Sequence, residues 1–149
     1  MVFSGTYDHT VDAKHRLTLP AAFREVLVGR VVVALSPETR PDAKCVEIWT
    51  PEGFSAHVEE LLAGTNARLP ATRELKRVLH SLSWPTELDS ANRVMIPAGA
   101  LTHAGIGTKV TVAGAGDCLE VWDRDRWSAY IGEQLANYSD LLKRVDDTA

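Results

Sequence analysis

An internal repeat limits what this chain can fold into more than any other feature. Residues 11–21 read Val-Asp-Ala-Lys-His-Arg-Leu-Thr-Leu-Pro-Ala, and residues 88–98 read Leu-Asp-Ser-Ala-Asn-Arg-Val-Met-Ile-Pro-Ala. Both place an aspartate four residues before an arginine, then alternating apolar residues and a proline. A second pair is Cys-Val-Glu-Ile-Trp at 45–49 and Cys-Leu-Glu-Val-Trp at 118–122. The two pairs are offset by 77 and 73 residues, so the chain is a tandem duplication.

Each copy alone is too short to build a large core. A unit of roughly 60 residues has a marginal core, so we expect the two copies to share one. Short alternating strands and amphipathic helical segments predict an α+β fold. Each copy reads strand–turn–strand–helix–strand–strand–helix, with one more helix at about 70–82 between the copies. No apolar run approaches the roughly 20 residues of a membrane span, and the N-terminus lacks the pattern of a secretory signal.

Capping residues and periodicity locate the longer helices. Thr50, Pro51 and Glu52 form a helix start. That helix should bury four apolar residues: Phe54, Val58, Leu61 and Leu62. The helix after Pro70 has two faces, one apolar (Leu75, Val78, Leu79 and Leu82) and one basic (Arg73, Lys76, Arg77 and His80). Asp123 should cap one final helix, which is expected to bury Trp127, Ile131, Leu135, Tyr138 and Leu142.

The charge of the chain is unevenly distributed. The net charge is −4, and residues 115–149 account for all of it, with 8 acidic and 4 basic residues. The rest of the chain is neutral overall. Nucleic-acid binding would therefore need a local basic patch, and an oligomer would present several copies of that patch to the nucleic acid. The basic face at residues 73–80 is a solvated surface or a docking site for an acidic partner, such as the C-terminal helix of a second copy.

The two Asp-x-x-x-Arg segments are the candidate site. A carboxylate and a guanidinium four residues apart can pair across a turn and fix the direction of the arginine, which gives Asp12 and Asp89 a structural role. The first turn carries Lys14, His15 and Arg16, whereas the second carries Ala91, Asn92 and Arg93. Lysine and arginine on a loop suit phosphate, and arginine also suits guanine; a solvated charged turn fits equally well. We expect equivalent structures and unequal functions.

Catalytic and metal-binding patterns are missing from the sequence. The histidines lack metal-ligand spacing, and neither cysteine has a CxxC partner. Cys45 and Cys118 are expected to be two buried thiols rather than a facing pair. Glu47 and Glu120 fit outward-facing strand positions better than a catalytic carboxylate pair, and the tryptophans fit core or interface anchors. We therefore expect a non-enzyme without cofactor, metal or small-molecule substrate.

The chain resembles the MraZ family of bacterial regulators over nearly its whole length. The resemblance rests on Phe3–Tyr7, Asp12–Arg24, Asp89–Ala98, His103–Ile106, and Leu119–Asp123 with Trp127. It implies two SpoVT-AbrB half-domains, at 5–52 and 83–126, that form one swapped-hairpin β-barrel. Connecting helices would occupy 53–82 and a C-terminal helix 127–149.

The resemblance also implies a function. It implies a ring-like oligomer that binds double-stranded DNA at short direct repeats and regulates the division and cell-wall gene cluster. Such a protein would be cytoplasmic and associated with the nucleoid. The DNA-contacting arginine of the family maps onto Arg16, beside Lys14, with Arg93 as its counterpart. The family usually has glycine before each arginine, where this chain has His15 and Asn92. One alternative is an antitoxin-like module that binds DNA and a protein partner. An enzyme is disfavoured, because the sequence contains no catalytic pattern.

Overall fold

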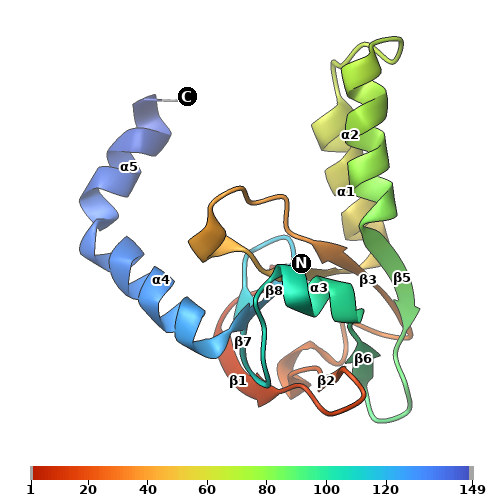
Figure 1. The fold of residues 1–149 in the computed structure, drawn as a ribbon, viewed down its shortest axis with the longest axis vertical. Coiled ribbons are helices and arrows are strands. Elements are labelled where there is room, and N and C mark those ends of the chain that lie inside the picture. Colours follow the sequence, from red (N-terminus) through yellow and green to blue (C-terminus); the bar gives the residue numbers. More distant parts are fainter. Residues whose placement is uncertain (1, 148–149) are drawn as a thin grey trace.

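The computed structural model describes residues 2–147 (Figure 1). Its strands are Thr6–Thr10 (β1), Arg16–Thr18 (β2), Arg30–Leu35 (β3), Val46–Trp49 (β4), Ser83–Glu87 (β5), Arg93–Met95 (β6), Lys109–Gly114 (β7) and Leu119–Asp123 (β8). Its α-helices are Pro51–Leu62 (α1), Pro70–Ser81 (α2), Ala98–His103 (α3), Arg124–Ala136 (α4) and Tyr138–Asp147 (α5). Two short 3₁₀ helices lie at Ala21–Phe23 (η1) and Pro41–Ala43 (η2). The α+β class is as predicted.

The strands form an open antiparallel sheet and a separate ribbon. The six-stranded sheet has the order β1-β7-β8-β4-β3-β5, and β2 pairs with β6. The expected closed barrel is wrong, because the sheet ends in the edge strands β1 and β5. The ribbon strands are three residues long, and Pro20 or Pro97 follows two residues later. A proline cannot donate to a strand ladder, which keeps both strands short.

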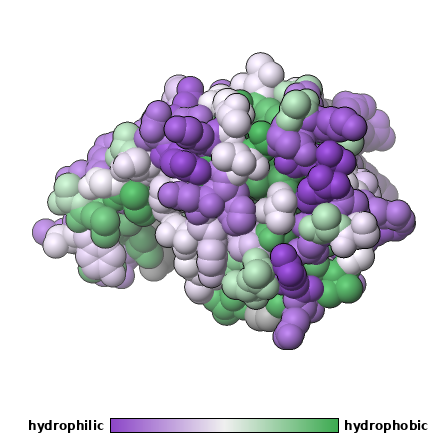
Figure 2. Space-filling view, turned by 90° about the horizontal axis from the view of Figure 1, so that it is seen from below, coloured by the Kyte–Doolittle hydropathy of each residue, from purple (hydrophilic) through white to green (hydrophobic). Residues whose placement is uncertain are grey.

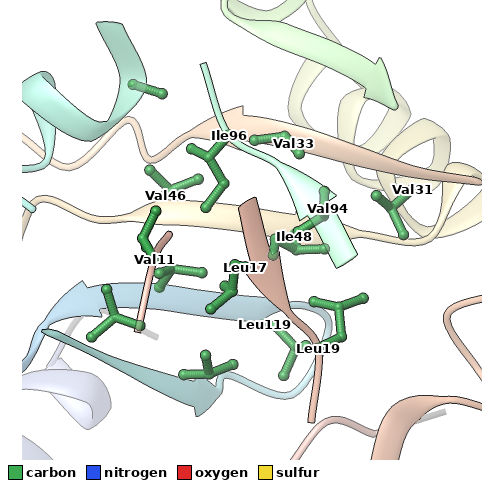
Figure 3. Close-up of a cluster of buried hydrophobic side chains, with 14 of the residues drawn as sticks. Val11, Leu17, Leu19, Val31, Val33, Val46, Ile48, Val94, Ile96 and Leu119 are labelled. Atoms are coloured by element: carbon green, nitrogen blue, oxygen red, sulfur yellow. The ribbon is translucent and has the colours of Figure 1, made fainter. Parts of the chain in front are cut away.

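The ribbon packs on one face of the sheet and completes a single core. Leu17 and Val94, at the centres of the two ribbon strands, are fully buried. Figure 3 shows them with Leu19 and Ile96 against side chains of β3, β4 and β8, among them Ile48. Both copies of the repeat contribute to this cluster. The prediction of a shared core is therefore confirmed.

An approximate twofold axis relates the two copies. In the ribbon, Leu17 lies directly opposite Val94, its equivalent in the repeat. In the sheet, β4 pairs with β8 so that Glu47 lies opposite Glu120, again its equivalent. An antiparallel pair has a local twofold axis wherever equivalent residues face each other. Each of these two pairs therefore lies on a local twofold axis.

The helices follow the predicted positions, but parts of their apolar faces are not covered. The Thr50 side chain caps α1, accepting from the Gly53 N–H at 3.0 Å, as predicted. Of the residues that α1 was expected to bury, Val58 is buried and Leu61 is exposed. On the apolar face of α2, Val78 and Leu82 are exposed. In Figure 1, α1 and α2 form a hairpin that projects from the sheet.

The expected single C-terminal helix is wrong. The Asp123 carboxylate accepts from the Arg126 N–H and caps α4 as predicted. However, α4 ends at Ala136, Asn137 is its C-cap, and α5 begins at Tyr138. Leu135, Tyr138 and Leu142 are more than half exposed, contrary to the prediction. Helical periodicity identifies an apolar face without showing what covers it. Residues 148–149 of the predicted C-terminal helix lie outside the described residues.

Strand β5 precedes the second repeated segment, where the pattern of the repeat predicts a strand. Pro85 lies opposite Val32 in the β3–β5 pair. Its missing N–H is tolerated because β5 is an edge strand with one free side. Within residues 2–147, no helix has both the length and the apolar character to cross a membrane.

Candidate nucleic-acid interface

The two repeated segments form two turns with the same backbone hydrogen bonds. In the first, the Asp12 N–H donates to the Arg16 carbonyl at 3.0 Å, and the His15 N–H donates to the Asp12 carbonyl at 3.0 Å. In the second, the corresponding distances from Asp89 to Arg93 and from Asn92 to Asp89 are 3.1 and 3.0 Å. We call residues 12–16 the first turn and residues 89–93 the second turn. Their backbones are equivalent.

Each aspartate holds its turn through three hydrogen bonds. One Asp12 oxygen accepts the N–H groups of Lys14 and Arg16, both at 2.9 Å, and the other accepts the Arg16 Nε at 3.0 Å. Asp89 repeats this with the N–H groups of Ala91 and Arg93 at 2.9 Å and the Arg93 Nε at 2.8 Å. The backbone N–H of each arginine is the largest cause that lowers the pKa of its aspartate. Both carboxylates therefore stay ionised at neutral pH.

The pairing leaves the outer edge of each guanidinium available. The Arg16 and Arg93 side chains are 28% and 32% exposed. Within the described part of the chain, only Nε of each is engaged in a hydrogen bond. The Nη groups can donate in parallel to a phosphate or to the O6 and N7 atoms of guanine. Each turn thus holds an arginine in a fixed direction with free donors.

His15 and Asn92 both have left-handed backbones, with φ of 61° and 59°. Each also links the two copies. The His15 carbonyl accepts the Ile96 N–H at 2.9 Å, and the Asn92 carbonyl accepts the Leu19 N–H at 3.1 Å. Glycine usually occupies such positions, and asparagine tolerates them better than histidine. The Asn92 side-chain nitrogen is buried with no hydrogen-bond partner among residues 2–147, whereas His15 is exposed.

The ribbon carries both arginines on one solvent-facing surface. Leu17 and Val94 point into the core, so alternation along each strand places their neighbours on the opposite face. Those neighbours are Arg16, Thr18, Arg93 and Met95, with Arg16 opposite Met95 and Thr18 opposite Arg93. We call this four-residue surface the ribbon face. Figure 2 shows the molecule from below, with hydrophilic side chains over the middle of the view and apolar ones between and beside them.

Sequence reasoning missed Thr18 and Met95 as members of this surface. Met95 is 56% exposed. Strand alternation could have identified them, because burial of Leu17 and Val94 places the neighbouring residues of each strand on the solvent-facing side. The exposed Lys14 and His15 side chains lie in the first turn, beside the ribbon face. The basic residues of α2 lie on the projecting hairpin, away from the ribbon (Figure 1).

The cysteines and glutamates lie on the opposite face of the sheet. Both cysteines are free and buried, and burial raises the pKa of each thiol. Cys45 packs with Trp122 and Cys118 with Trp49, in separate clusters, so the prediction of two buried thiols is confirmed. Within residues 2–147, no group of three or more histidine, cysteine or acidic residues could hold a metal ion.

The glutamates differ from the expected outward-facing residues, because both are half-buried. The indole N–H groups of Trp49 and Trp122 donate to Glu47 and Glu120 at 3.1 and 3.0 Å. The tryptophans are buried beneath the helices that follow β4 and β8. Burial is the main cause that raises the pKa of Glu47 to about 7.

Comparison with known proteins places these features in a family. The family model described as "MraZ protein, putative antitoxin-like" matches residues 2–78 and 85–148. A protein named transcriptional regulator MraZ from Ligilactobacillus salivarius is 34% identical over 150 residues, covering 98% of each chain. The proteins of the same name from Micrococcus luteus and Leuconostoc citreum are 34% and 31% identical, and each alignment covers at least 96% of both chains. The chain belongs to the MraZ family.

Proposed function

We propose that this chain is a sequence-specific DNA-binding transcriptional regulator. The observation that carries the proposal is the ribbon face, where two aspartate-paired arginines at diagonal positions present their Nη donors on one surface. The similar proteins in three bacteria are named transcriptional regulators, which favours this role over an enzyme. We propose Lys14, His15, Arg16, Asn92 and Arg93 as the DNA-binding residues.

The two-stranded ribbon is an element of the kind that enters the major groove of DNA. A two-stranded β-ribbon fits that groove, where arginine reads guanine through two parallel hydrogen bonds. Because Asp12 and Asp89 already fix the guanidinium planes, little side-chain entropy is lost on binding. Lys14, which is exposed in the first turn, would contact a phosphate beside the groove. Arg16 would make the main contact, with Arg93 as its weaker counterpart.

Assembly would compensate for a site that is small and a chain that is acidic. We propose a ring-like homo-oligomer whose subunits engage short direct repeats on one DNA, so that weak contacts add up. Exposed apolar residues on the projecting helices support self-association: Leu69, Val78 and Leu82 on or beside α2, and Leu135, Tyr138 and Leu142 on α4 and α5. An isolated monomer would leave these residues in water.

The repeat and its pairing support two interleaved half-domains at 5–52 and 83–126, with 53–82 and 127–149 as helical additions used for assembly. The proposed target is the promoter of the division and cell-wall gene cluster, at the nucleoid in the cytoplasm.

A second candidate is an antitoxin-like module, which the family description and the uncovered face of α5 favour. In that case, a second protein would occupy the α4–α5 arm while the ribbon face still bound DNA. Purification of the chain from its native host distinguishes the antitoxin-like function from the ring-like homo-oligomer. A stoichiometric protein partner on this arm would favour the antitoxin-like function, and a pure homo-oligomer would favour the ring.

The deciding experiment is a gel shift with the DNA upstream of the chain's own gene, with the mass of the oligomer measured in parallel. The wild-type chain should retard this DNA more strongly than an unrelated duplex of equal length. Arg16→Ala should abolish the shift and leave the oligomer mass unchanged. Normal binding by this variant would refute the proposed site.

A further inference from the structure

The ribbon face contains one large apolar side chain, Met95, among polar ones. Met95 lies directly opposite Arg16 in the ribbon, at cross-strand contact distance. Its neighbours in the chain, Val94 and Ile96, are fully buried and hold the strand to the core. Met95 itself is 56% exposed, so packing does not explain why a methionine stands at this position.

The repeat provides an internal comparison for this position. The equivalent of Met95 in the first copy is Thr18, which lies opposite Arg93 and is half-buried. Each arginine therefore has a different cross-strand neighbour: a long thioether beside Arg16 and a short hydroxyl beside Arg93. The two halves of the ribbon face differ in chemistry, although their backbones are related by the twofold axis.

The floor of the major groove offers one apolar group, the C5-methyl group of thymine. A methionine side chain is unbranched and adaptable, which suits contact with such a methyl group. An arginine that is fixed on guanine holds its cross-strand neighbour within reach of the adjacent base pair. A contact on one side of the axis only would also give a nearly symmetric protein a direction along the DNA.

We propose that Met95 is a specificity-determining residue that contacts the thymine C5-methyl group next to the base bound by Arg16. This inference rests on the proposed function, and it adds a residue and a chemical group that the turns alone do not identify. An exposed methionine could instead be a contact between subunits, and the experiment below separates the two roles.

The test uses the upstream duplex that the wild-type chain protects in a footprint. The duplex is resynthesised with deoxyuridine in place of thymidine, one position at a time, which removes only the methyl group. At one position per binding site, wild-type affinity should fall about three- to fivefold, as expected when one methyl contact is lost. Met95→Ala should bind the thymidine duplex more weakly by a similar factor and be insensitive to deoxyuridine at that position.

Two control variants define the result. Met95→Leu should keep the sensitivity to deoxyuridine, because leucine also offers apolar contact. Thr18→Ala should keep it too, because Thr18 lies on the other side of the axis. Oligomer mass is measured for every variant.

Three outcomes would overturn the proposal. If the wild-type chain binds but no single deoxyuridine weakens it, Met95 reads no methyl group, although the DNA-binding function stands. If Met95→Ala stays as sensitive as the wild-type chain, or changes the oligomer mass instead, Met95 has another role, such as a subunit contact. If the wild-type chain binds no DNA, the proposed function fails and this inference fails with it.

Discussion

The first and second turns show how one backbone can serve two different purposes. In both turns an aspartate accepts the same three hydrogen bonds, and the residue before the arginine has a positive φ. In both, the outer edge of the guanidinium has no hydrogen bond within residues 2–147. The side chains between the aspartate and the arginine do not affect these features. The only requirement is that the residue before the arginine can adopt a positive φ. The geometry is therefore a property of the Asp-x-x-x-Arg frame.

The residues inside the frame differ in charge and exposure. The first turn presents Lys14 and His15 to solvent, whereas the second has Ala91 and the half-buried Asn92. A cation beside a fixed arginine strengthens attraction to phosphate, and a neutral turn does not. The duplication therefore preserved the shape of the turn, and we expect the inner residues to set how much each turn contributes to binding.

The largest expected difference between the turns is in DNA affinity after loss of each arginine. Arg16→Ala should weaken binding about 100-fold or more, because each lost guanine contact is worth roughly 1–3 kcal/mol and several subunits lose it together. Arg93→Ala, the matched variant, should weaken binding about tenfold. Fluorescence anisotropy with the upstream duplex measures both. Equal losses would show that the two turns contribute equally.

A second pair of equivalent residues, Glu47 and Glu120, allows a test by pH. The pKa of Glu47 is about 7 in the folded chain against an ordinary value of 4.5. The folded chain therefore binds this proton more tightly than the unfolded chain, and stability is lost as pH rises from about 4.5 through 7. Glu47→Gln should raise the free energy of unfolding by about 3 kcal/mol at pH 8 and leave it nearly unchanged at pH 4.

The matched control for this test is Glu120→Gln, with urea unfolding measured at several pH values. It removes the neighbouring negative charge, a smaller cause of the raised pKa than burial. We therefore expect Glu120→Gln to flatten the pH dependence only in part. A wild-type chain whose stability is constant between pH 4.5 and 7 would contradict the role of Glu47.

The left-handed residues should respond to glycine in both turns, for different reasons. His15→Gly relieves backbone strain, and Asn92→Gly removes a buried amide that has no partner among the described residues. We expect each to stabilise the chain by about 0.5–1 kcal/mol, measured by urea unfolding. Asn92→Ala separates the two causes, because it removes the amide and keeps the strained Cβ. Destabilisation by either glycine variant would show that the side chain is needed.

Lys14 should have the smallest effect. Lys14→Ala removes one phosphate contact per engaged subunit, so affinity should fall about threefold at moderate salt and the dependence of log affinity on log salt should become shallower. The matched variant Ala91→Lys should strengthen binding and steepen the dependence. An unchanged salt dependence for Lys14→Ala would place this lysine outside the interface.

The sequence predicted the shared core and most elements because those depend on local pattern. Alternation placed Leu17 and Val94 in strands, and the duplication implied that the two copies complete one core. Thr50 and Asp123 identified helix starts because capping depends on residues only a few positions away. The exposed Met95 also follows from alternation, although only once the buried partner strand is known.

The remaining differences depend on contacts that no local pattern contains. Closure of the sheet depends on how many residues each ribbon strand can pair, and Pro20 and Pro97 limit that number. The exposure of Leu135 and Tyr138 depends on whether another element lies over them. The half-burial of Glu47 depends on Trp49 folding over it, which strand alternation does not reveal.

Charge inside equivalent Asp-x-x-x-Arg frames makes the two turns unequal, and a chain with exchanged turns tests this most directly. The variant Lys14→Ala/His15→Asn/Ala91→Lys/Asn92→His moves the basic residues to the second turn. Arg16→Ala and Arg93→Ala are then compared in this background by anisotropy with the upstream duplex. Arg93→Ala should then become the more damaging change. If Arg16→Ala remains far more damaging, position in the assembly sets the difference between the turns, and the charge in each turn does not.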